Sequence, residues 1–357
     1  MRLLRFFAFG AVLVAAAGCG SRTGLLVPDE PPEGPVEAGV DASLDASDAG
    51  APQDAAPDAT APDAPFDSGP DAPADVTLDA VRDAPPPLDV GKSVPIGCEE
   101  AGVDGTLIYL VTAQNDLWSF YPPSLAFRLI GHINCSDPLT PFSMAVDQTG
   151  IAYVLYADGH LFRVRTADAF CQATPFRVGQ EGFVTFGMGY SQNPSGIGET
   201  LYIASDQTEG GAPSQLGLID TTQFAVHAVG PFPPQIASAE LTGTGAGDLF
   251  AFYAVDPTPN APTGSGPPSA IGQIDKANGG LLGQTILPNV AQGCGWAFAF
   301  WGGDFYTFTA PPAPGACGAM TLSVVSRYRP ADGSQNEIAR FGEEIVGAGV
   351  STCAPQE

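Results

Sequence analysis

The sequence predicts an all-β fold, a five-bladed β-propeller that the last strand of the chain closes. Three observations predict it. Residues 98–357 are rich in Gly, β-branched and aromatic residues and show no long amphipathic helical pattern. One aromatic recurs in five strand-like segments, as Tyr109, Tyr153, Tyr202, Phe250 and Tyr306. A second strand pattern recurs in order and then once more at the C-terminal end, as expected for a closed ring.

The recurring aromatic lies in segments that alternate in the manner of strands, at residues 107–113, 151–157, 200–206, 248–254 and 304–310. After each segment comes a second one, whose first apolar residue is Leu117, Leu161, Leu216, Ile271 or Val325. These residues are 44, 55, 55 and 54 positions apart. Turn pairs such as Asp158-Gly159 and Asn278-Gly279 separate strands. The spacing predicts one four-stranded blade per repeat.

A further strand precedes the aromatic one in four repeats, at residues 142–147, 186–191, 237–242 and 296–301. The first repeat lacks it, and its counterpart lies at residues 346–351. We expect this last strand to complete the first blade, which joins the chain ends and covers a sheet edge. A β-sandwich or jelly roll is the alternative, but neither explains the displaced strand.

The strand and turn pattern at residues 216–222 and 271–276 resembles that of NHL-like and quinoprotein-like bacterial propellers. The resemblance extends loosely over the propeller region. It implies the fold and carries no catalytic residue across.

The inner strands should line the propeller axis, and alternate residues of a strand face opposite sides. The pattern places Glu240 in one ring with Ala145, Gly189, Ala299 and Gly349. A carboxylate among small residues is the anomaly of this ring. One interpretation is a charge solvated by water in the channel, and the other is a contact to a ligand or cation. Glu240 is therefore the predicted binding residue.

Catalytic signatures are scarce. His132, His160 and His227 fall at unrelated strand positions, so we expect neither a metal site nor a histidine-based triad, and no cofactor. The alternative function is a secreted carbohydrate-active hydrolase or lyase, because propellers of this size include glycosidases that use paired carboxyls. Its candidate catalytic residues are Asp147, Glu240 and Asp304.

Residues 1–18 have the pattern of a signal peptide, with Arg2 and Arg5 before an apolar run too short to span a bilayer. The run ends in small residues before Cys19, which resembles the bacterial lipobox, although Ala16 stands where leucine is commonest. We expect lipid on Cys19 and a lipidated N-terminus over residues 19–27. Gly20 is compatible with sorting to an outer membrane. The alternative is an ordinary signal peptide cut near Ala17, which leaves Cys19 as a free thiol.

Residues 28–97 consist largely of Asp, Ala and Pro. Between Asp29 and Val90 there are 16 acidic residues and one basic residue, Arg82, a net charge of −15 (1 − 16). Such a segment cannot bury a core and should form an extended, disordered linker. The propeller region, residues 98–357, carries 23 acidic and 8 basic residues, again −15 (8 − 23). We therefore do not expect nucleic acid as a partner.

Six cysteines follow Cys19, and an even number in an exported domain favours three disulfides over a zinc site. Sequence alone allows 15 connectivities for six cysteines. The blade assignment favours a clasp of Cys98 with Cys353, a pair of Cys294 with Cys317, and, by elimination, Cys135 with Cys171.

These features predict a monomeric recognition or scaffold protein in the cell envelope. A lipid should hold it at a membrane, most simply the outer membrane, on the periplasmic or the surface side. One propeller face should bind a protein or glycan that the sequence does not identify.

Overall fold

The computed structural model describes residue 98 and residues 106–136, 138–206, 213–236, 238–255, 268–311 and 321–357. The predicted signal peptide, the lipid site Cys19, the Asp/Ala/Pro-rich linker and Cys317 lie outside these residues.

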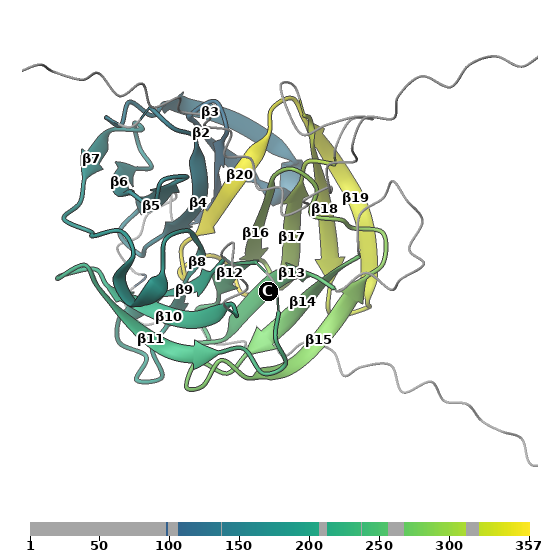
Figure 1. Cartoon of the computed structure of the whole chain (residues 1–357). Helices are drawn as coiled ribbons and strands as arrows, with labels where there is room; N and C mark the ends of the chain where they lie inside the picture. Colours follow the sequence, from purple (N-terminus) through teal and green to yellow (C-terminus); the bar gives the residue numbers. More distant parts are fainter. Residues whose placement is uncertain are drawn as a thin grey trace, which may run out of the picture. The chain divides into compact units, whose positions relative to one another are not determined.

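The described residues form five antiparallel four-stranded sheets arranged as the blades of a propeller (Figure 1), which confirms the predicted fold. Blade 1 contains β20 (Ile345–Val350), β1 (Ile108–Thr112), β2 (Asp116–Tyr121) and β3 (Ala126–His132). Blade 2 contains β4 (Pro141–Val146), β5 (Ile151–Tyr156), β6 (Leu161–Arg165) and β7 (Cys171–Ala173). Blade 3 contains β8 (Phe186–Gln192), β9 (Glu199–Ser205), β10 (Gln215–Asp220) and β11 (Ala225–Pro231).

Blade 4 contains β12 (Ala239–Gly243), β13 (Leu249–Ala254), β14 (Ser269–Ile274) and β15 (Leu281–Leu287). Blade 5 contains β16 (Trp296–Trp301), β17 (Asp304–Thr309), β18 (Ser323–Arg329) and β19 (Ser334–Phe341). Short 3₁₀ turns occur at Pro122–Ser124 and Gln180–Gly182.

The C-terminal strand closes the ring, as the displaced repeat predicts. β20 pairs antiparallel with β1, with Ile108 opposite Val350 and Tyr109 opposite Gly349. The recurring aromatic has the same place in each blade, opposite a small residue of the inner strand: Gly349, Ala145, Gly189, Thr242 or Ala299. One blade is therefore built from both ends of the described propeller, so the ring depends on the last strand.

The apolar core lies between neighbouring blades. Five clusters of buried residues each join two adjacent sheets, and large aromatic side chains fill several of them. Phe298 of blade 5, for example, stacks on Phe305 of the same blade with ring centroids 5.5 Å apart, and on Phe252 of blade 4 at 5.7 Å. Packing of this kind fixes each blade against the next.

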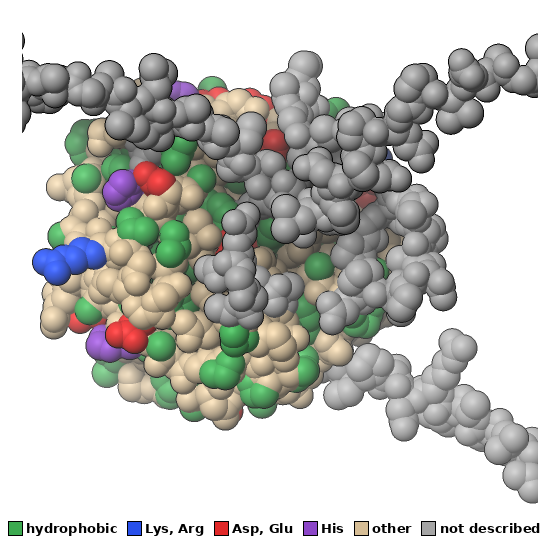
Figure 2. Space-filling view, viewed as in Figure 1, with side chains coloured by type: hydrophobic (Ala, Val, Ile, Leu, Met, Phe, Trp, Pro, Cys, Tyr) green, Lys and Arg blue, Asp and Glu red, His purple; other side chains and the backbone are tan. Residues whose placement is uncertain are grey.

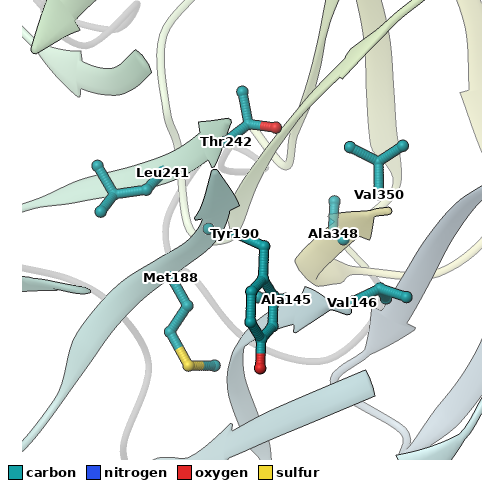
Figure 3. Close-up of a pocket in the computed structure, with 10 residues that line it drawn as sticks. Ala145, Val146, Met188, Tyr190, Leu241, Thr242, Ala348 and Val350 are labelled. Carbon is teal, nitrogen blue, oxygen red and sulfur yellow. The ribbon is translucent and has the colours of Figure 1, made fainter. Parts of the chain in front are cut away.

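The inner strands β4, β8, β12, β16 and β20 pack so closely that the axis is closed. A Cβ atom on Gly187 would lie 1.9 Å from the Ala239 carbonyl oxygen, and one on Gly349 would lie 2.8 Å from the Val146 nitrogen. The remaining gap between the strands, lined by residues such as Met188 and Ala348, admits no water molecule (Figure 3). The propeller therefore has a packed axis in place of a water-filled channel at this level.

Two predicted disulfides are present. Cys98 bonds Cys353 with their Cα atoms 5.2 Å apart, and Cys135 bonds Cys171 with Cα atoms 5.3 Å apart. Cys294 is also disulfide-bonded, and its predicted partner Cys317 lies outside the described residues. Disulfides form and persist in oxidising compartments, so they indicate an extracytoplasmic environment.

The Cys135–Cys171 bond joins positions that strand order alone assigns to opposite faces. Successive strands of a sheet rotate by roughly 20–25°, so the outer strands of a blade lie strongly turned from the inner ones. As a result, the end of β3 reaches the turn between β6 and β7, where a Cβ on Gly131 would lie 3.3 Å from the Ala169 Cβ. The face to which a residue of an outer strand belongs can therefore not be assigned from the direction of the inner strands.

Candidate functional site

The two ends of the axis differ in what covers them. Four of the five inner strands end in a turn to the next strand, and these turns, at residues 147–150, 193–198, 244–248 and 302–303, form what we term the closing face. The C-terminal residues 351–357 follow β20 at this same face. The end at which the inner strands begin is termed the opposite face.

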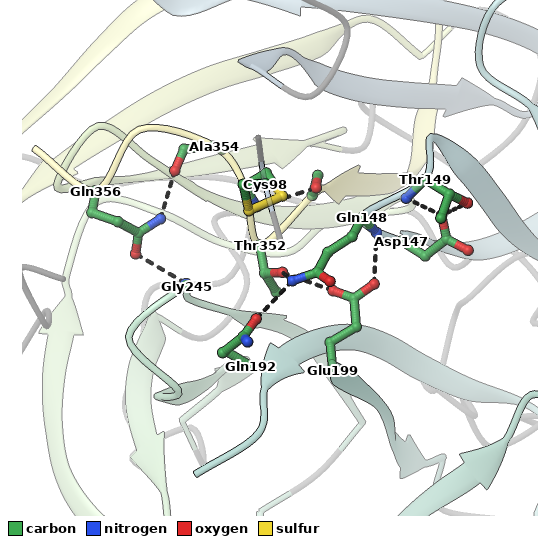
Figure 4. Close-up of a disulfide and its surroundings, with 12 residues drawn as sticks. Cys98, Asp147, Gln148, Thr149, Gln192, Glu199, Gly245, Thr352, Ala354 and Gln356 are labelled. Carbon is green, nitrogen blue, oxygen red and sulfur yellow. Dashed lines mark hydrogen bonds between the residues drawn. A yellow bond between two sulfur atoms is a disulfide. The ribbon is translucent and has the colours of Figure 1, made fainter. Parts of the chain in front are cut away.

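The C-terminal segment crosses the closing face and contacts four blades. The Gly302 N–H donates to the Pro355 carbonyl at 2.7 Å, and the Gly245 N–H donates to Gln356 Oε1 at 3.0 Å. The Thr352 hydroxyl donates to Glu199 Oε2 at 2.8 Å and accepts a bond from blade 2 (Figure 4). Thr352 is 1% exposed. The segment therefore seals this end of the axis, and the Cys98–Cys353 bond ties it to the start of the propeller.

Glu199 is the central titratable group of this seal. Its Oε1 accepts the backbone N–H of Gln148 at 2.6 Å, and the Gln148 side chain donates to Gln192 Oε1 at 2.7 Å and to Thr352 at 2.9 Å. Burial raises the pKa of Glu199 to about 7. The hydrogen bonds that Glu199 accepts from the Gln148 backbone and from the Thr352 hydroxyl oppose this rise. The Asp147 carboxylate adds a smaller upward effect on that pKa.

Asp147 and Asp304, two of the predicted catalytic carboxylates, both make local contacts at the closing face. Asp147 Oδ1 accepts from the Thr149 backbone and hydroxyl at 2.8 and 2.7 Å, so it caps its own turn. Asp304 forms an ion pair with Arg329, with Nε and Oδ1 3.3 Å apart, and lies 3.7 Å from Arg327 Nε. Asp147 thus stabilises the turn after β4, and Asp304 joins the start of β17 to β18, both at the closing face.

Glu240, the predicted binding residue, lies in the inner strand β12 with 1% exposure. Strand pairing places it one layer from the expected ring. Glu240 is opposite Phe252, and the matching inner-strand residues of the other blades are Ser143, Gly187, Ala297 and Gly347. Thr242 occupies the layer that the sequence assigned to Glu240. The side chain is enclosed, so bulk solvent does not reach it.

The Glu240 carboxylate has a defined partner across the axis. The Ser143 hydroxyl of β4 donates to Glu240 Oε2 at 2.8 Å, and Ser143 is itself fully buried. β8 lies between these two strands and presents Gly187 there, so no side chain separates the hydroxyl from the carboxylate. The contact joins blades 2 and 4 and gives the buried carboxylate a structural role.

The three predicted carboxylates are not gathered at one end of the axis. Asp147 lies four residues beyond Ser143, and Asp304 pairs with Trp301, four residues beyond Ala297 in the Glu240 layer. Four strand residues span about 13 Å. The neighbour of Asp147 is Glu199, which the sequence did not single out.

Blade 2 contains a separate pocket of about 300 Å³. The β5–β6 turn, the start of β6, the end of β7 and the loop after β3 form it, and its lining residues are Ser136, Pro138, Asp158, His160, Leu161, Phe162, Ala173, Thr174 and Phe176. We term this the blade 2 pocket. His160 Nδ1 lies 2.6 Å from Asp158 Oδ2. Figure 2 shows histidine and acidic side chains side by side on the surface of the protein.

The Cys135–Cys171 bond holds one wall of the blade 2 pocket. Ser136 follows Cys135 directly, and Ala173 lies two residues after Cys171 on β7. The bond therefore fixes the loop after β3 against the outer strand of the next blade. The sequence pattern places Asp158 in a turn and His160 in a strand, and only the predicted pair of Cys135 with Cys171 indicated that the loop after β3 meets blade 2.

Among the residues that the structure describes, no group of three or more His, Cys, Asp or Glu side chains is placed to hold a metal ion. The same residues include no helix long and apolar enough to cross a membrane.

No protein-family model matches the chain, and no curated protein matches it. Two solved structures match the chain at 11% identity. The tricorn protease matches with a TM-score of 0.34, covering 66% of this chain and 25% of the protease, so the chain spans about a quarter of that protein. A protein of unknown function from Bacteroides caccae matches with a TM-score of 0.37, covering 68% of this chain and 98% of the other. The strand pairing defines the propeller independently of both.

Proposed function

We propose that this protein is an extracytoplasmic recognition or scaffold protein, held at a membrane by a lipid on Cys19, that binds a protein or glycan through its propeller. The observation that carries the proposal is the combination of a closed axis, a sealed closing face and a blade 2 pocket. A rigid ring with these features offers a surface for binding on the opposite face and the rim.

The contacts of the carboxylates favour recognition over hydrolysis. A glycosidase needs two carboxyl groups on opposite sides of one glycosidic bond. Asp304 is paired with arginine, Asp147 caps a turn, and Glu240 is enclosed at the axis. Glu199 has the raised pKa of a general acid, but the C-terminal segment covers it through Thr352. No observation gives a substrate access to a pair of them, so the hydrolase or lyase remains the weaker proposal.

The anchoring part of the proposal rests on the sequence. Lipid on Cys19 with a linker over residues 28–97 places the propeller away from the membrane, at an upper reach on the order of 200 Å for extended proline-rich chain. Such a tether suits a protein that samples a layer of the envelope, on the periplasmic or the surface side of an outer membrane. The propeller itself needs no partner subunit in this proposal.

Replacing Cys19 by Ala tests the anchor. We expect the variant to lose its lipid label and to move from the membrane fraction to the soluble fraction. Ser21→Ala is the matched control, because it changes a small residue close to the predicted lipid site and leaves Cys19 in place. A C19A variant that keeps its label and stays in the membrane fraction overturns the anchor.

Binding without turnover tests the function. The full-length protein is incubated with an array of envelope glycans and with purified envelope proteins, and the products are examined for cleavage. Recognition predicts saturable binding to a member of either set with no cleaved bond. Cleavage of a glycan in proportion to protein concentration supports the hydrolase or lyase instead, and the absence of any saturable binding contradicts recognition.

A further inference from the structure

We infer that the blade 2 pocket is a binding site for one neutral sugar residue of a glycan. The inference rests on the proposed recognition function and deepens it by assigning the ligand class and the residues that contact it. It involves neither the axis nor the closing face.

The size and lining of the pocket suit a single sugar ring. A volume of about 300 Å³ is at the lower end of the usual range for ligand sites. The lining combines four polar side chains, those of Ser136, Asp158, His160 and Thr174, with five apolar residues. A sugar ring presents the same mixture, since its hydroxyl groups form hydrogen bonds and its C–H faces pack on apolar side chains. An aliphatic or aromatic side chain of a partner protein would leave the remaining donor and acceptor positions of these polar groups unused.

Charge favours a neutral ligand. The lining includes the Asp158 carboxylate and no lysine or arginine. The propeller region as a whole has the net charge of −15 counted above, so it repels anions. A phosphate, sulfate or acidic sugar therefore meets no countercharge in the lining. Few basic side chains are visible on the face shown in Figure 2. A neutral hexose or N-acetylhexosamine meets no such penalty.

The polar groups of the pocket are held in fixed orientations. Asp158 accepts the backbone N–H of His160 at 3.0 Å and contacts its ring Nδ1 at 2.6 Å, which orients the imidazole and places a proton on Nδ1. The Thr174 hydroxyl donates to the Leu161 carbonyl at 2.6 Å. Phe162 and Phe176, which are 6% and 7% exposed, contribute apolar surface to the lining. Groups held in this way lose little freedom when a ligand binds.

The chain offers a closely matched control. His132 and Asp116 form a second histidine–carboxylate pair, with Nδ1 and Oδ1 2.9 Å apart, outside the pocket lining. Their side chains are 56% and 24% exposed, against 58% and 30% for His160 and Asp158. Substitutions in the two pairs therefore change surface charge and exposed area by similar amounts. They differ in that only Asp158 and His160 line the pocket.

The test uses the full-length protein and ligand-detected NMR with methyl glycosides of neutral hexoses and N-acetylhexosamines. At least one glycoside should receive saturation from the protein, and Asp158→Asn and His160→Ala should each weaken its binding about tenfold or more, since a bond to a charged group is lost or altered. Asp116→Asn and His132→Ala should leave it within about twofold. Unchanged melting temperatures confirm that the pocket variants are folded, and Ser136→Ala is a further variant if either is not.

Three outcomes overturn the sugar assignment, and each reports differently on the proposed function. Glycan binding that the pocket variants leave intact moves the site elsewhere and keeps recognition. Saturation of N-acetyltryptophanamide with none of any glycoside assigns the pocket to a protein side chain and also keeps recognition. No binding to the glycosides, the glycan array or the envelope proteins contradicts both proposals.

Discussion

Glu199→Gln should remove a specific pH dependence from the stability of the propeller. The pKa of Glu199 rises from 4.5 to about 7 on folding, chiefly through burial. Between these values the folded carboxyl keeps its proton while the unfolded one ionises, so folding binds a proton. The stabilising contribution is therefore fully present below about pH 4.5 and is lost as pH rises through about 7. At 1.36 kcal/mol per pKa unit, the change amounts to about 3 kcal/mol.

Urea unfolding of the full-length protein at several pH values between 4 and 8 measures this effect. The free energy of unfolding of the wild type relative to E199Q should fall by about 3 kcal/mol across that range. Glu337→Gln is the control, because Glu337 is 46% exposed and pairs with Arg340 at the surface. The difference in free energy of unfolding between E337Q and the wild type should vary little over the same pH range. Parallel pH curves for the wild type and E199Q would refute the assignment of a raised pKa and the close burial of this group under the C-terminal segment.

Two further substitutions test the closure of the chain and the packing of the axis. Replacing Cys98 and Cys353 by Ser should lower the free energy of unfolding by about 5 kcal/mol in the chain-entropy model, because the bond spans 255 residues; an equal urea midpoint contradicts the clasp. Gly187→Ala should lower the free energy of unfolding by about 3 kcal/mol or more, because its Cβ would overlap the Ala239 carbonyl. Gly283→Ala is the control, because a Cβ there meets no atom within 4 Å. Similar thermal melting of the two alanine variants argues against inner strands in direct contact.

The repeats of the sequence determine most of the fold. The recurring aromatic and the strand displaced to residues 346–351 predict the blade number and the closure that the β20–β1 pairing confirms. The Cys98–Cys353 clasp follows from that closure, since both cysteines lie at the ends of the same blade. These features are predictable because they depend on alternation along strands and on order along the chain.

The layer of Glu240 was predicted wrongly for an identifiable reason. Blade 4 pairs Thr242 with Phe250 eight residues later, as blade 2 pairs Ala145 with Tyr153, so the predicted segment at residues 237–242 was aligned two residues too early. The distance is thirteen residues for Gly189 and Tyr202 in blade 3, where the turn is longer, so no constant spacing revealed the shift. Alternation shows which face of a strand a residue occupies, and a shift of two residues preserves that face. Glu240 was therefore placed on the correct side of β12 and in the wrong layer.

The contacts around Glu199 and in the blade 2 pocket depend on residues far apart in the chain. Glu199 meets Thr352 across 153 positions, and its burial requires the C-terminal segment to cross the ring. His160 lines a pocket because a disulfide and the strong twist of the outer strands bring the loop after β3 over blade 2. Neither arrangement leaves a local pattern. An exported chain with cysteines in loops gives at most the hint that distant loops are joined.

Thermal unfolding of a chain truncated after Glu344 tests the central claim most directly, because the closed axis, the sealed face and the fixed position of blade 2 all depend on β20 completing the ring. The truncation removes Ile345–Val350, which pairs with β1 and packs between β4 and β16, together with the segment that covers the closing face. We expect the cooperative transition to be lost or its midpoint to fall by more than 10 °C, a large effect for a domain of this size at roughly 2–4 °C per kcal/mol. A melting curve that matches the wild type contradicts closure of the propeller by its last strand.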